Sequence, residues 1–418
     1  MKVLVLGSGA KDAAIAWWFS KSRLIEELYV APANPGTRDY AINLDKLNPS
    51  DKEQVLEVCK KHGIDLVFIG TEAPLICGVI DYLAENGIKT CGTPMYAMKL
   101  ESDRIFSREF AKKYKIPMPD FNLFKTEKEL QSFLKKNAKK TFTIKPNALS
   151  PSRVIVNSSD FDVIMSYAKE HFKSADVILE DYIEGMPVTF TMFLDEKGHL
   201  DMPLCSEYSR REHSDSDIIT GGMGSVCPVP LNNDSLTNIY DKIINPTLKG
   251  MKKEKLLYRG VLTFSIMLNG CEPYLVDYHV RLNDPATQTF AVLVKNDLCE
   301  IMNAMNSDTL SDIQLETTGN SSVGVVIASS GYPSKPKTGC KIQYSSYPEN
   351  NSYMFFGAVS ERGNGLFTNG GRIATIVGIA DNILNANSTA YGNIDSVKFN
   401  GSWYREDIGS KFFSSTVN

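Results

Sequence analysis

The chain has 418 residues, of which 43% are apolar and 22% are charged, and its formal net charge is −4. This length exceeds what one hydrophobic core usually supports and predicts roughly three domains. The mildly acidic balance argues against a nucleic acid as the main partner, because binding to a phosphate backbone needs a basic surface. No run of eighteen apolar residues occurs, so no membrane span is expected.

Cysteine and histidine usage narrows the class further. The eight cysteines are scattered without a Cys-x-x-Cys pattern, and the five histidines show no spacing typical of metal ligands. Scattered cysteines are typical of reduced core residues. We therefore expect a cytoplasmic protein without a zinc site.

The first segment of the chain predicts a strand, a glycine turn and a helix. Lys2–Leu6 is an apolar run typical of a buried parallel strand, Gly7 and Gly9 follow it, and residues 12–19 predict a helix. A glycine turn before a helix N-terminus is a plausible anion site. The third glycine of the usual pattern is missing, so these glycines could equally serve the turn alone.

The same unit then repeats. Ser50 and Glu53 predict a capping box for a helix that ends at His62. Asp65–Ile69 predicts the next buried strand, and residues 70–74 predict the turn after it. Strands and helices alternate to about residue 100. This rhythm indicates an open parallel sheet with its ligands at the carboxyl ends of the strands.

The rhythm changes after the proline-rich connector Ile116–Pro119. A smaller α+β unit follows, with predicted strands at Thr141–Lys145 and Val177–Asp181. A larger α+β unit comes next. From Val323 onward, short strands with glycine turns precede one helix at about Asp381–Asn393. The predicted domains are 1–119, 120–190, 191–325 and 326–418.

Residues 274–288 are the most informative stretch. Tyr274–Val276 predicts a short strand that ends at Asp277, with His279 and Arg281 at the same parity and a turn at 283–285. An acid, a potential ligand and a fixed cation on one face suit a site for a metal and a phosphate. The alternative is an edge strand with alternating charges and no chemistry.

Short motifs throughout the chain occur in an order that resembles one family. They are Lys2–Gly9, Ala33–Thr37, Gly70–Leu75, Leu100–Phe106, Thr220–Gly224, Arg281 with Asp284–Gln288, Ser330–Pro333, Thr368–Arg372 and Asp407–Gly409. The chain closely resembles the phosphoribosylamine–glycine ligases, also called glycinamide ribonucleotide synthetases, which are ATP-grasp enzymes of purine synthesis. The resemblance covers essentially the whole chain.

The resemblance implies a fold of mixed α/β and α+β class and a reaction. The expected ATP-grasp architecture has an N-terminal Rossmann-like domain with a parallel sheet, a small lid domain, a large central domain and a small β-rich C-terminal domain. The expected enzyme uses ATP and Mg²⁺, with Mn²⁺ as the alternative metal, to phosphorylate glycine, and the amine of phosphoribosylamine then attacks the glycyl phosphate. The expected partners are these small molecules, and the expected state is a monomer or a small homo-oligomer.

The resemblance also assigns site residues. The residues expected at ATP are Arg104, Lys145, Glu180, Asp181, Tyr182 and Ile183. Those expected at the other substrates are Gly7, Gly9, Asn34, Gly36, Glu72, Arg210, Gly221, Gly222 and Gly224. Asp277 and His279 fall at the metal positions, and Arg281 and Asp284 are the expected catalytic residues. A guanidinium such as that of Arg281 binds a carboxylate or acyl phosphate through two parallel hydrogen bonds.

Some positions depart from the family pattern. The loop at residues 147–153 has no glycine, Pro187 replaces a ribose-binding glutamate, and Asp277 and His279 stand where the family has glutamate and asparagine. Two alternatives therefore remain beside a working synthetase. One is a diverged paralogue with weak or no ligase activity that serves as a binding or regulatory protein. The other is an ATP-grasp ligase for a different amine and carboxylate.

Overall fold

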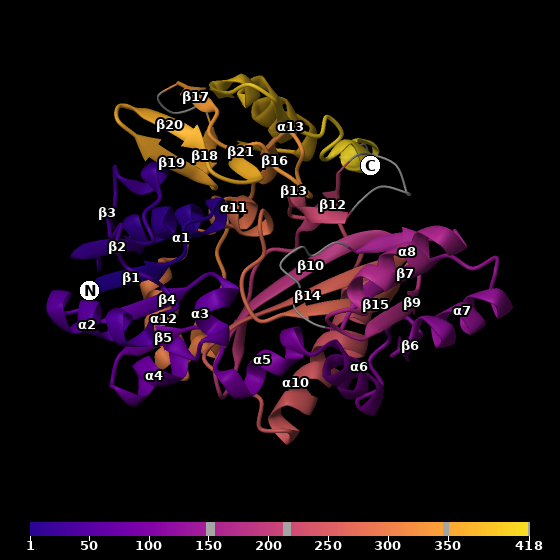
Figure 1. Cartoon of the computed structure of the whole chain (residues 1–418). Helices are drawn as coiled ribbons and strands as arrows, with labels where there is room; N and C mark the ends of the chain where they lie inside the picture. The colour runs from indigo at the N-terminus through magenta and orange to yellow at the C-terminus, as the bar shows by residue number, and fades with distance from the viewer. Residues whose placement is uncertain (148–154, 212–218, 346–350, 417–418) are drawn as a thin grey trace.

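The N-terminal part of the chain forms the expected parallel sheet (Figure 1). The computed structural model describes residues 1–147, 155–211, 219–345 and 351–416. The strand order is β3-β2-β1-β4-β5, and the strands are β1 (Lys2–Leu6), β2 (Glu27–Ala31), β3 (Ile42–Asn43), β4 (Leu66–Ile69) and β5 (Lys89–Cys91). The order changes direction between β1 and β4. The segments that follow these two strands therefore meet at the carboxyl edge, where a doubly wound sheet binds its ligands.

Helices connect and cover this sheet. They are α1 (Ala10–Ser20), α2 (Lys52–His62), α3 (Glu72–Ile76) and α4 (Val79–Glu85), with a short 3₁₀ turn η1 (Pro35–Thr37). Two further helices, α5 (Met95–Ser102) and α6 (Arg104–Lys113), follow β5 and lead from this sheet toward the next unit of the chain (Figure 1). The predicted capping box at Ser50 is wrong, because the Asp51 carboxylate accepts the Gln54 N–H and caps α2 one residue later. The predicted turn at 70–74 is too long, because α3 begins at Glu72. Pro74 is tolerated there, since the first helical turn needs no intrahelical donor.

A small antiparallel sheet follows, in the order β6-β9-β7-β8. Its strands are β6 (Phe121–Phe124), β7 (Phe142–Pro146), β8 (Val156–Ser158) and β9 (Val177–Asp181), and its helices are α7 (Glu127–Lys136) and α8 (Phe161–His171). Leu130 and Leu134 of α7 and Ile164 of α8 pack on the inner residues of β7 and β9. This core holds the two predicted strands of the small unit, β7 and β9, side by side.

The larger antiparallel sheet has the order β11-β10-β14-β15. Its strands are β10 (Met186–Leu194), β11 (His199–Asp201), β14 (Gly260–Asn269) and β15 (Glu272–His279), and the helical segments near it are α9 (Asn233–Ile239), the π-helical η2 (Tyr240–Ile244), α10 (Asn245–Lys253) and the 3₁₀ turn η3 (Leu310–Asp312). Helix α11 (Ala286–Ala291) packs against α1, and α12 (Leu298–Asn306) packs on the parallel sheet of the N-terminal part (Figure 1). The strand predicted at Tyr274–Val276, with Asp277 at its end, is too short, because β15 runs from Glu272 to His279. Asp277 pairs with Ser265 and His279 with Thr263, so both lie inside the strand, beside a bulge. Polar side chains that face a cavity do not interrupt backbone pairing.

The β-rich C-terminal part contains two further sheets, at the top of Figure 1. One has the path β12-β13-β16-β21-β18 with β23 beside β16, and the other has the order β19-β20-β17-β22. The strands are β12 (Ser206–Arg210), β13 (Ile219–Cys227), β16 (Ser321–Ser329), β17 (Lys341–Tyr344), β18 (Ser352–Phe356), β19 (Val359–Arg362), β20 (Gly365–Thr368), β21 (Arg372–Ala380), β22 (Val397–Lys398) and β23 (Ser402–Trp403). Helix α13 (Ile383–Gly392) and the 3₁₀ turns η4 (Ile394–Ser396) and η5 (Ser410–Thr416) complete this part.

Two features of this part bear on the sequence predictions. The domain boundaries stay predictions, and β16 spans the predicted boundary between residues 325 and 326. The glycine segment Gly221–Gly224 lies within β13. Among the helices that the structure describes, none is long and apolar enough to cross a membrane.

Candidate active site

A buried cluster of charges joins the small sheet to the larger one. Lys145 of β7 and Glu180 of β9 are each only 1% exposed. The Lys145 Nζ lies 2.9 Å from a Glu180 carboxylate oxygen and 3.1 Å from Asp277 Oδ2 on β15. Three residues predicted from separate motifs therefore meet at one point.

Two arginines complete the cluster, and one of them was not predicted. Arg108 of α6 is fully buried, and its Nη2 lies 2.6 Å from Glu180 Oε1 and 3.2 Å from Asp277 Oδ1. It also donates to the Val276 carbonyl. Arg104, one helical turn earlier, donates to the Pro146 carbonyl at 2.7 Å, and its Nε lies 4.0 Å from Asp277 Oδ1. Arg104 and Arg108 are four residues apart and therefore share one helix face, but this spacing alone does not show that the face is buried.

The cations hold Asp277 in its charged form. Burial alone would raise the pKa of the Asp277 carboxyl, but Lys145 and then Arg108 outweigh burial and lower it well below its usual range. Asp277 is thus a carboxylate at every physiological pH. Three cations surround two carboxylates, so the cluster carries a positive excess that suits a phosphate group.

A cavity of about 520 Å³ opens beside this cluster. Five of the six residues predicted at ATP line it, namely Lys145, Glu180, Asp181, Tyr182 and Ile183. Arg104, the sixth, lines the adjoining cavity. Arg210 was predicted at the other substrates, but it lies in the first cavity, where its Nη2 donates to the Tyr182 hydroxyl at 3.1 Å.

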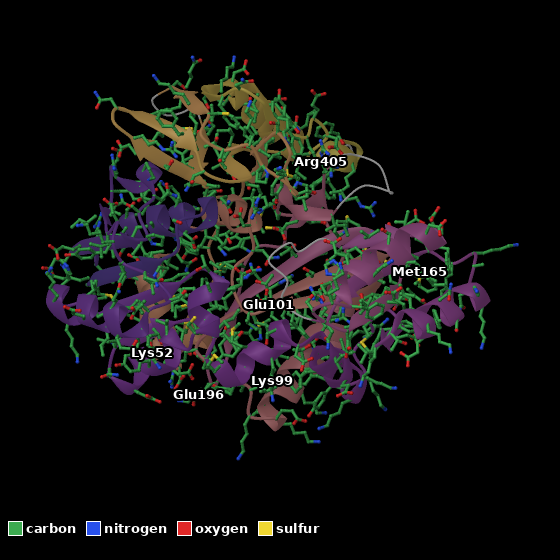
Figure 2. All side chains as sticks on the ribbon, in the orientation of Figure 1. Lys52, Lys99, Glu101, Met165, Glu196 and Arg405 are labelled. Atoms are coloured by element: carbon green, nitrogen blue, oxygen red, sulfur yellow. The ribbon has the colours of Figure 1, made fainter. Side chains whose placement is uncertain are left out.

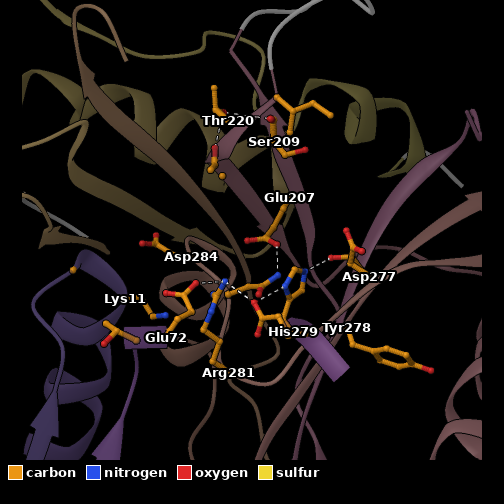
Figure 3. Close-up of a pocket in the computed structure, with 18 of the residues that line it drawn as sticks. Lys11, Glu72, Glu207, Ser209, Thr220, Asp277, Tyr278, His279, Arg281 and Asp284 are labelled. Carbon is orange, nitrogen blue, oxygen red and sulfur yellow. Dashed lines mark hydrogen bonds and ion pairs between the residues drawn. The ribbon is translucent and has the colours of Figure 1, made fainter. Parts of the chain in front are cut away.

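The adjoining cavity has a volume of about 380 Å³ (Figure 3). Most of the residues predicted to bind the other substrates or the metal, or to act in catalysis, line this second cavity. They are Gly9, Glu72, Gly221, Gly222, Asp277, His279, Arg281 and Asp284. Asp277 lines both cavities, and so do Ile155, Glu207, Ser209, Ile219 and Ser265, so the two spaces adjoin along these residues. Figure 3 shows Tyr278 pointing away from Asp277 and His279, as the alternation along β15 requires.

Arg281 is already paired with two carboxylates. Its Nη2 lies 2.6 Å from a Glu72 oxygen and 3.1 Å from Glu101 Oε1. Glu101 was quoted within a motif but given no role from the sequence. It also accepts from the His279 ring at 3.3 Å and from the Val280 N–H at 2.9 Å. Burial would raise the pKa of Glu101, but the Arg281 guanidinium and the His279 ring lower it to about 2.

Asp284 is held by the C-terminal part of the chain. Its Oδ2 lies 3.2 Å from Arg372 Nη2, and its Oδ1 accepts from the Gln288 amide at 2.7 Å. Arg372 Nη1 also donates to the carbonyls of Gly222 and Asp284, at 3.1 and 2.9 Å. The Thr368–Arg372 motif therefore contributes an arginine that braces Asp284 at the cavity wall.

Four residues predicted to bind substrate line neither of the two cavities. They are Gly7, Asn34, Gly36 and Gly224. The buried Asn34 amide instead donates to the Ser8 and Phe356 carbonyls, at 3.0 and 2.8 Å. A Cβ at Gly224 would lie 2.5 Å from Ile408. These residues support loops and packing in the structure, and their contact with substrate stays a prediction.

The donor set at the metal positions fits Mg²⁺ only in part. The described residues contain no group of three or more His, Cys, Asp or Glu side chains placed to hold a metal ion. Asp277 fits, because Mg²⁺ is commonly held by one or two carboxylates together with phosphate oxygens and waters. His279 does not fit: both of its ring nitrogens have protein partners, Glu101 and Ser265, and imidazole is a poor Mg²⁺ ligand.

The glycine-free loop of the sequence begins at Asn147. Residues 148–153 of the loop at 147–153 lie outside the described residues. Asn147 is described, and its side-chain oxygen accepts from the Ile105 N–H at 3.3 Å. The loop therefore begins next to Arg104 on α6.

The fold and the family comparison define an ATP-grasp protein, with two α+β units beside a parallel-sheet domain. Comparison with protein families narrows the class. Residues 1–101, 102–287 and 322–411 match the N domain, the ATP-grasp (A) domain and the C domain of phosphoribosylglycinamide synthetase. The chain belongs to the phosphoribosylglycinamide synthetase family.

Individual relatives match this chain over nearly their whole length. The chain is 31% identical over 418 residues to a phosphoribosylamine–glycine ligase of Clostridium acetobutylicum, covering 98% of this chain and 99% of the relative. It is 30% identical to one from Caldanaerobacter subterraneus, covering 99% and 100%. A crystal structure of the Thermotoga maritima phosphoribosylamine–glycine ligase superposes with a TM-score of 0.83 at 26% identity, covering 97% of this chain and 100% of that one.

Proposed function

We propose that this protein joins glycine to 5-phosphoribosylamine with ATP, giving glycinamide ribonucleotide, ADP and phosphate in purine synthesis. Family membership over the whole chain supports this reaction. The observation that carries it is the meeting of Lys145, Glu180 and Asp277 where the two cavities join. Small-molecule partners and a cytoplasmic location are part of the same proposal. A monomer or small homo-oligomer remains the prediction.

In the first step, an oxygen of the glycine carboxylate attacks the γ-phosphorus of ATP and ADP leaves. Lys145 and Arg104 compensate the phosphate charge, and Arg108 keeps the two carboxylates in place so that Lys145 can turn toward the phosphates. This positioning of charge supplies most of the catalysis in phosphoryl transfer. Asp277 is the residue that would hold Mg²⁺, which neutralises phosphate charge when it is bound.

In the second step, the amine of phosphoribosylamine attacks the carbonyl carbon of the glycyl phosphate. A C–N bond forms, the C–O bond to phosphate breaks, and the phosphate leaves with the electron pair. The nitrogen loses one proton, which the departing phosphate can accept. Arg281 would hold the acyl phosphate, because a guanidinium matches its oxygens. Glu72 would release Arg281 and turn toward the incoming amine.

The direct experiment measures glycinamide ribonucleotide formed from ATP, glycine and phosphoribosylamine with Mg²⁺. We expect product in the wild type and none in Lys145→Ala, because phosphate charge would be left uncompensated. Lys136→Ala is the control, since Lys136 is exposed on α7. Wild-type protein that makes no product from these substrates, but makes one from another amine or carboxylate, would contradict the proposed substrates.

A paralogue with weak or no turnover is the second candidate. One observation favours it: both oxygens of Asp277 already have cationic partners, Lys145 and Arg108. A calorimetric titration separates the two functions. Tight binding of ATP together with no release of ADP under any substrate combination would favour this second candidate.

A further inference from the structure

One buried carboxylate contacts three consecutive residues at the end of β15. Glu101 belongs to α5, and its side chain is 6% exposed. Its Oε1 lies 3.3 Å from His279 Nδ1 and 3.1 Å from Arg281 Nη2, and its Oε2 accepts from the Val280 N–H at 2.9 Å. Figure 2 labels Glu101 near the middle of the molecule, between the parallel sheet and the larger antiparallel sheet. The N-terminal part of the chain thereby orients His279, the last residue of β15, and Arg281 just beyond it.

The contact fixes the proton on the His279 ring. A carboxylate is only an acceptor, so His279 Nδ1 must carry a proton where it faces Glu101. The other ring nitrogen, Nε2, lies 2.9 Å from the Ser265 hydroxyl, which can donate to it. A carboxylate behind an imidazole commonly fixes both the tautomer and the ring orientation. His279 is thus locked between Glu101 and Ser265.

Arg281 is held by two carboxylates that differ in exposure. The Glu72 side chain is 24% exposed and lines the cavity, whereas that of Glu101 is 6% exposed. An incoming substrate carboxylate can replace Glu72 at the guanidinium without displacing Glu101. The bond to Glu101 therefore persists and keeps the guanidinium aimed at the cavity.

We propose that Glu101 is a positioning residue for the glycine-activating half of the site. It holds Arg281 in place to receive the glycine carboxylate, and it holds His279 as a fixed neighbour of Asp277 rather than as a metal ligand. This inference rests on the proposed function for its kinetic consequence. Its structural consequence, the proton on Nδ1, does not depend on turnover.

Glu101→Gln tests the kinetic consequence. A glutamine keeps the size of the side chain but removes its charge and places an N–H donor against a donor of Val280, His279 or Arg281. We expect the KM for glycine to rise by about tenfold or more, because a charge-assisted hydrogen bond is lost. The KM for ATP should change by less than about twofold, because the cluster around Lys145 is untouched.

Two further variants make this result specific. Glu101→Asp restores the carboxylate with a shorter reach and should recover part of the glycine affinity. Glu109→Gln, an exposed glutamate on α6, should match the wild type in both constants. An unchanged KM for glycine in Glu101→Gln would overturn the proposal, and so would equal increases for glycine and ATP, which indicate general damage to the fold.

Nitrogen NMR of histidine-labelled protein tests the structural consequence in the full chain. Spectra at about pH 8.5, some two units above the ordinary histidine pKa, report which ring nitrogen carries the proton. His279→Asn identifies the signals. We expect the proton on Nδ1 in the wild type and a mixture of tautomers in Glu101→Gln. A wild-type proton on Nε2 overturns the inference even if the enzyme is active. Absence of wild-type turnover with the proton on Nδ1 would instead refute the proposed function and leave the role of Glu101 in place.

Discussion

At the scale of single residues, the charge cluster depends on a side chain that no motif indicated. Arg108 contacts Glu180, Asp277 and the Val276 carbonyl, and its side chain is completely buried. A buried cluster of charges is stable only while each member keeps its partners. Arg108 therefore supplies a cationic partner to both Glu180 and Asp277.

Replacing Arg108 should be costly. Arg108→Met leaves two buried carboxylates short of one cation, and we expect the free energy of unfolding to fall by about 3–5 kcal/mol. Arg108→Lys should lose less, because it keeps the charge but not the fork of donors. Urea denaturation measures both, with Lys112→Met, an exposed site on α6, as the control. Equal stability of Arg108→Met and the control would show that the cluster contributes nothing.

The lowered pKa of Glu101 predicts how the stability of the fold depends on pH. Its pKa is about 2 in the folded protein against 4.5 as the ordinary value, so the folded state binds this proton less readily than the unfolded chain. The contribution to stability is complete above about pH 5 and is lost as the pH falls from about 4.5 toward 2. It amounts to about 3 kcal/mol. Urea midpoints between pH 6 and pH 3 should fall more steeply for the wild type than for Glu101→Gln, and parallel curves would contradict this assignment.

The sequence predicted some of the residues that form the candidate site but not the residues that hold them in place. Lys145, Glu180 and Asp277 lie near the carboxyl ends of strands that the sequence predicted in part, and their chemistry could be inferred from motif order. Arg108 and Glu101 lie on α6 and α5, where charged residues usually face solvent. Their burial results from packing of these helices against β15, and no local pattern encodes that contact. The pairing of Arg281 with Glu72 was missed for the same reason, since more than 200 residues separate them.

At the scale of elements, β13 shows why a glycine segment can be a strand. Glycines are disfavoured in strands and predict turns. Here a Cβ at Gly222 would lie 2.3 Å from Pro285, and one at Gly224 would lie 2.5 Å from Ile408. Close approach to segments distant in sequence therefore explains the glycines.

Gly224→Ala should destabilise the protein without altering the nucleotide site. The new methyl group would collide with Ile408, and overpacking of this kind costs about 1–3 kcal/mol. Thermal denaturation should show a lower midpoint, while ATP affinity of the folded protein stays the same. Gly392→Ala is a matched control, because no atom lies within 4 Å of the added Cβ on the exposed end of α13. A large loss of ATP affinity in Gly224→Ala would instead support a substrate role for this glycine.

At the scale of the whole molecule, the candidate site lies where separate sheets meet. The first cavity is lined by β7, β9, β15 and the segment Arg405–Lys411, and the second is lined by residues that follow β1 and β4. The alternation of strands and helices predicted the parallel sheet. The pairing of β13 with β16, which joins β12 and β13 to the C-terminal strands, could not be predicted. About a hundred residues separate the two strands, and such distant pairing leaves no local pattern in the sequence.

A ligand bound between these units should stabilise the whole chain. ATP at a hundred times its dissociation constant would add about 2.7 kcal/mol to the folded state and raise the melting temperature by a few degrees. Differential scanning fluorimetry with ATP and Mg²⁺ measures the increase. Folded Lys145→Ala should show little or no rise in melting temperature on addition of ATP. A rise equal to that of the wild type would mean that the nucleotide binds elsewhere.

The measurement that tests the account most directly follows oxygen from glycine to phosphate. In the proposed reaction, a carboxylate oxygen of glycine becomes part of the phosphate that leaves in the second step. Wild-type protein supplied with glycine labelled with ¹⁸O in its carboxylate, ATP and phosphoribosylamine should release inorganic phosphate that carries one labelled oxygen. Mass spectrometry of the phosphate decides the matter, because product formation with unlabelled phosphate would contradict a glycyl phosphate formed at this site.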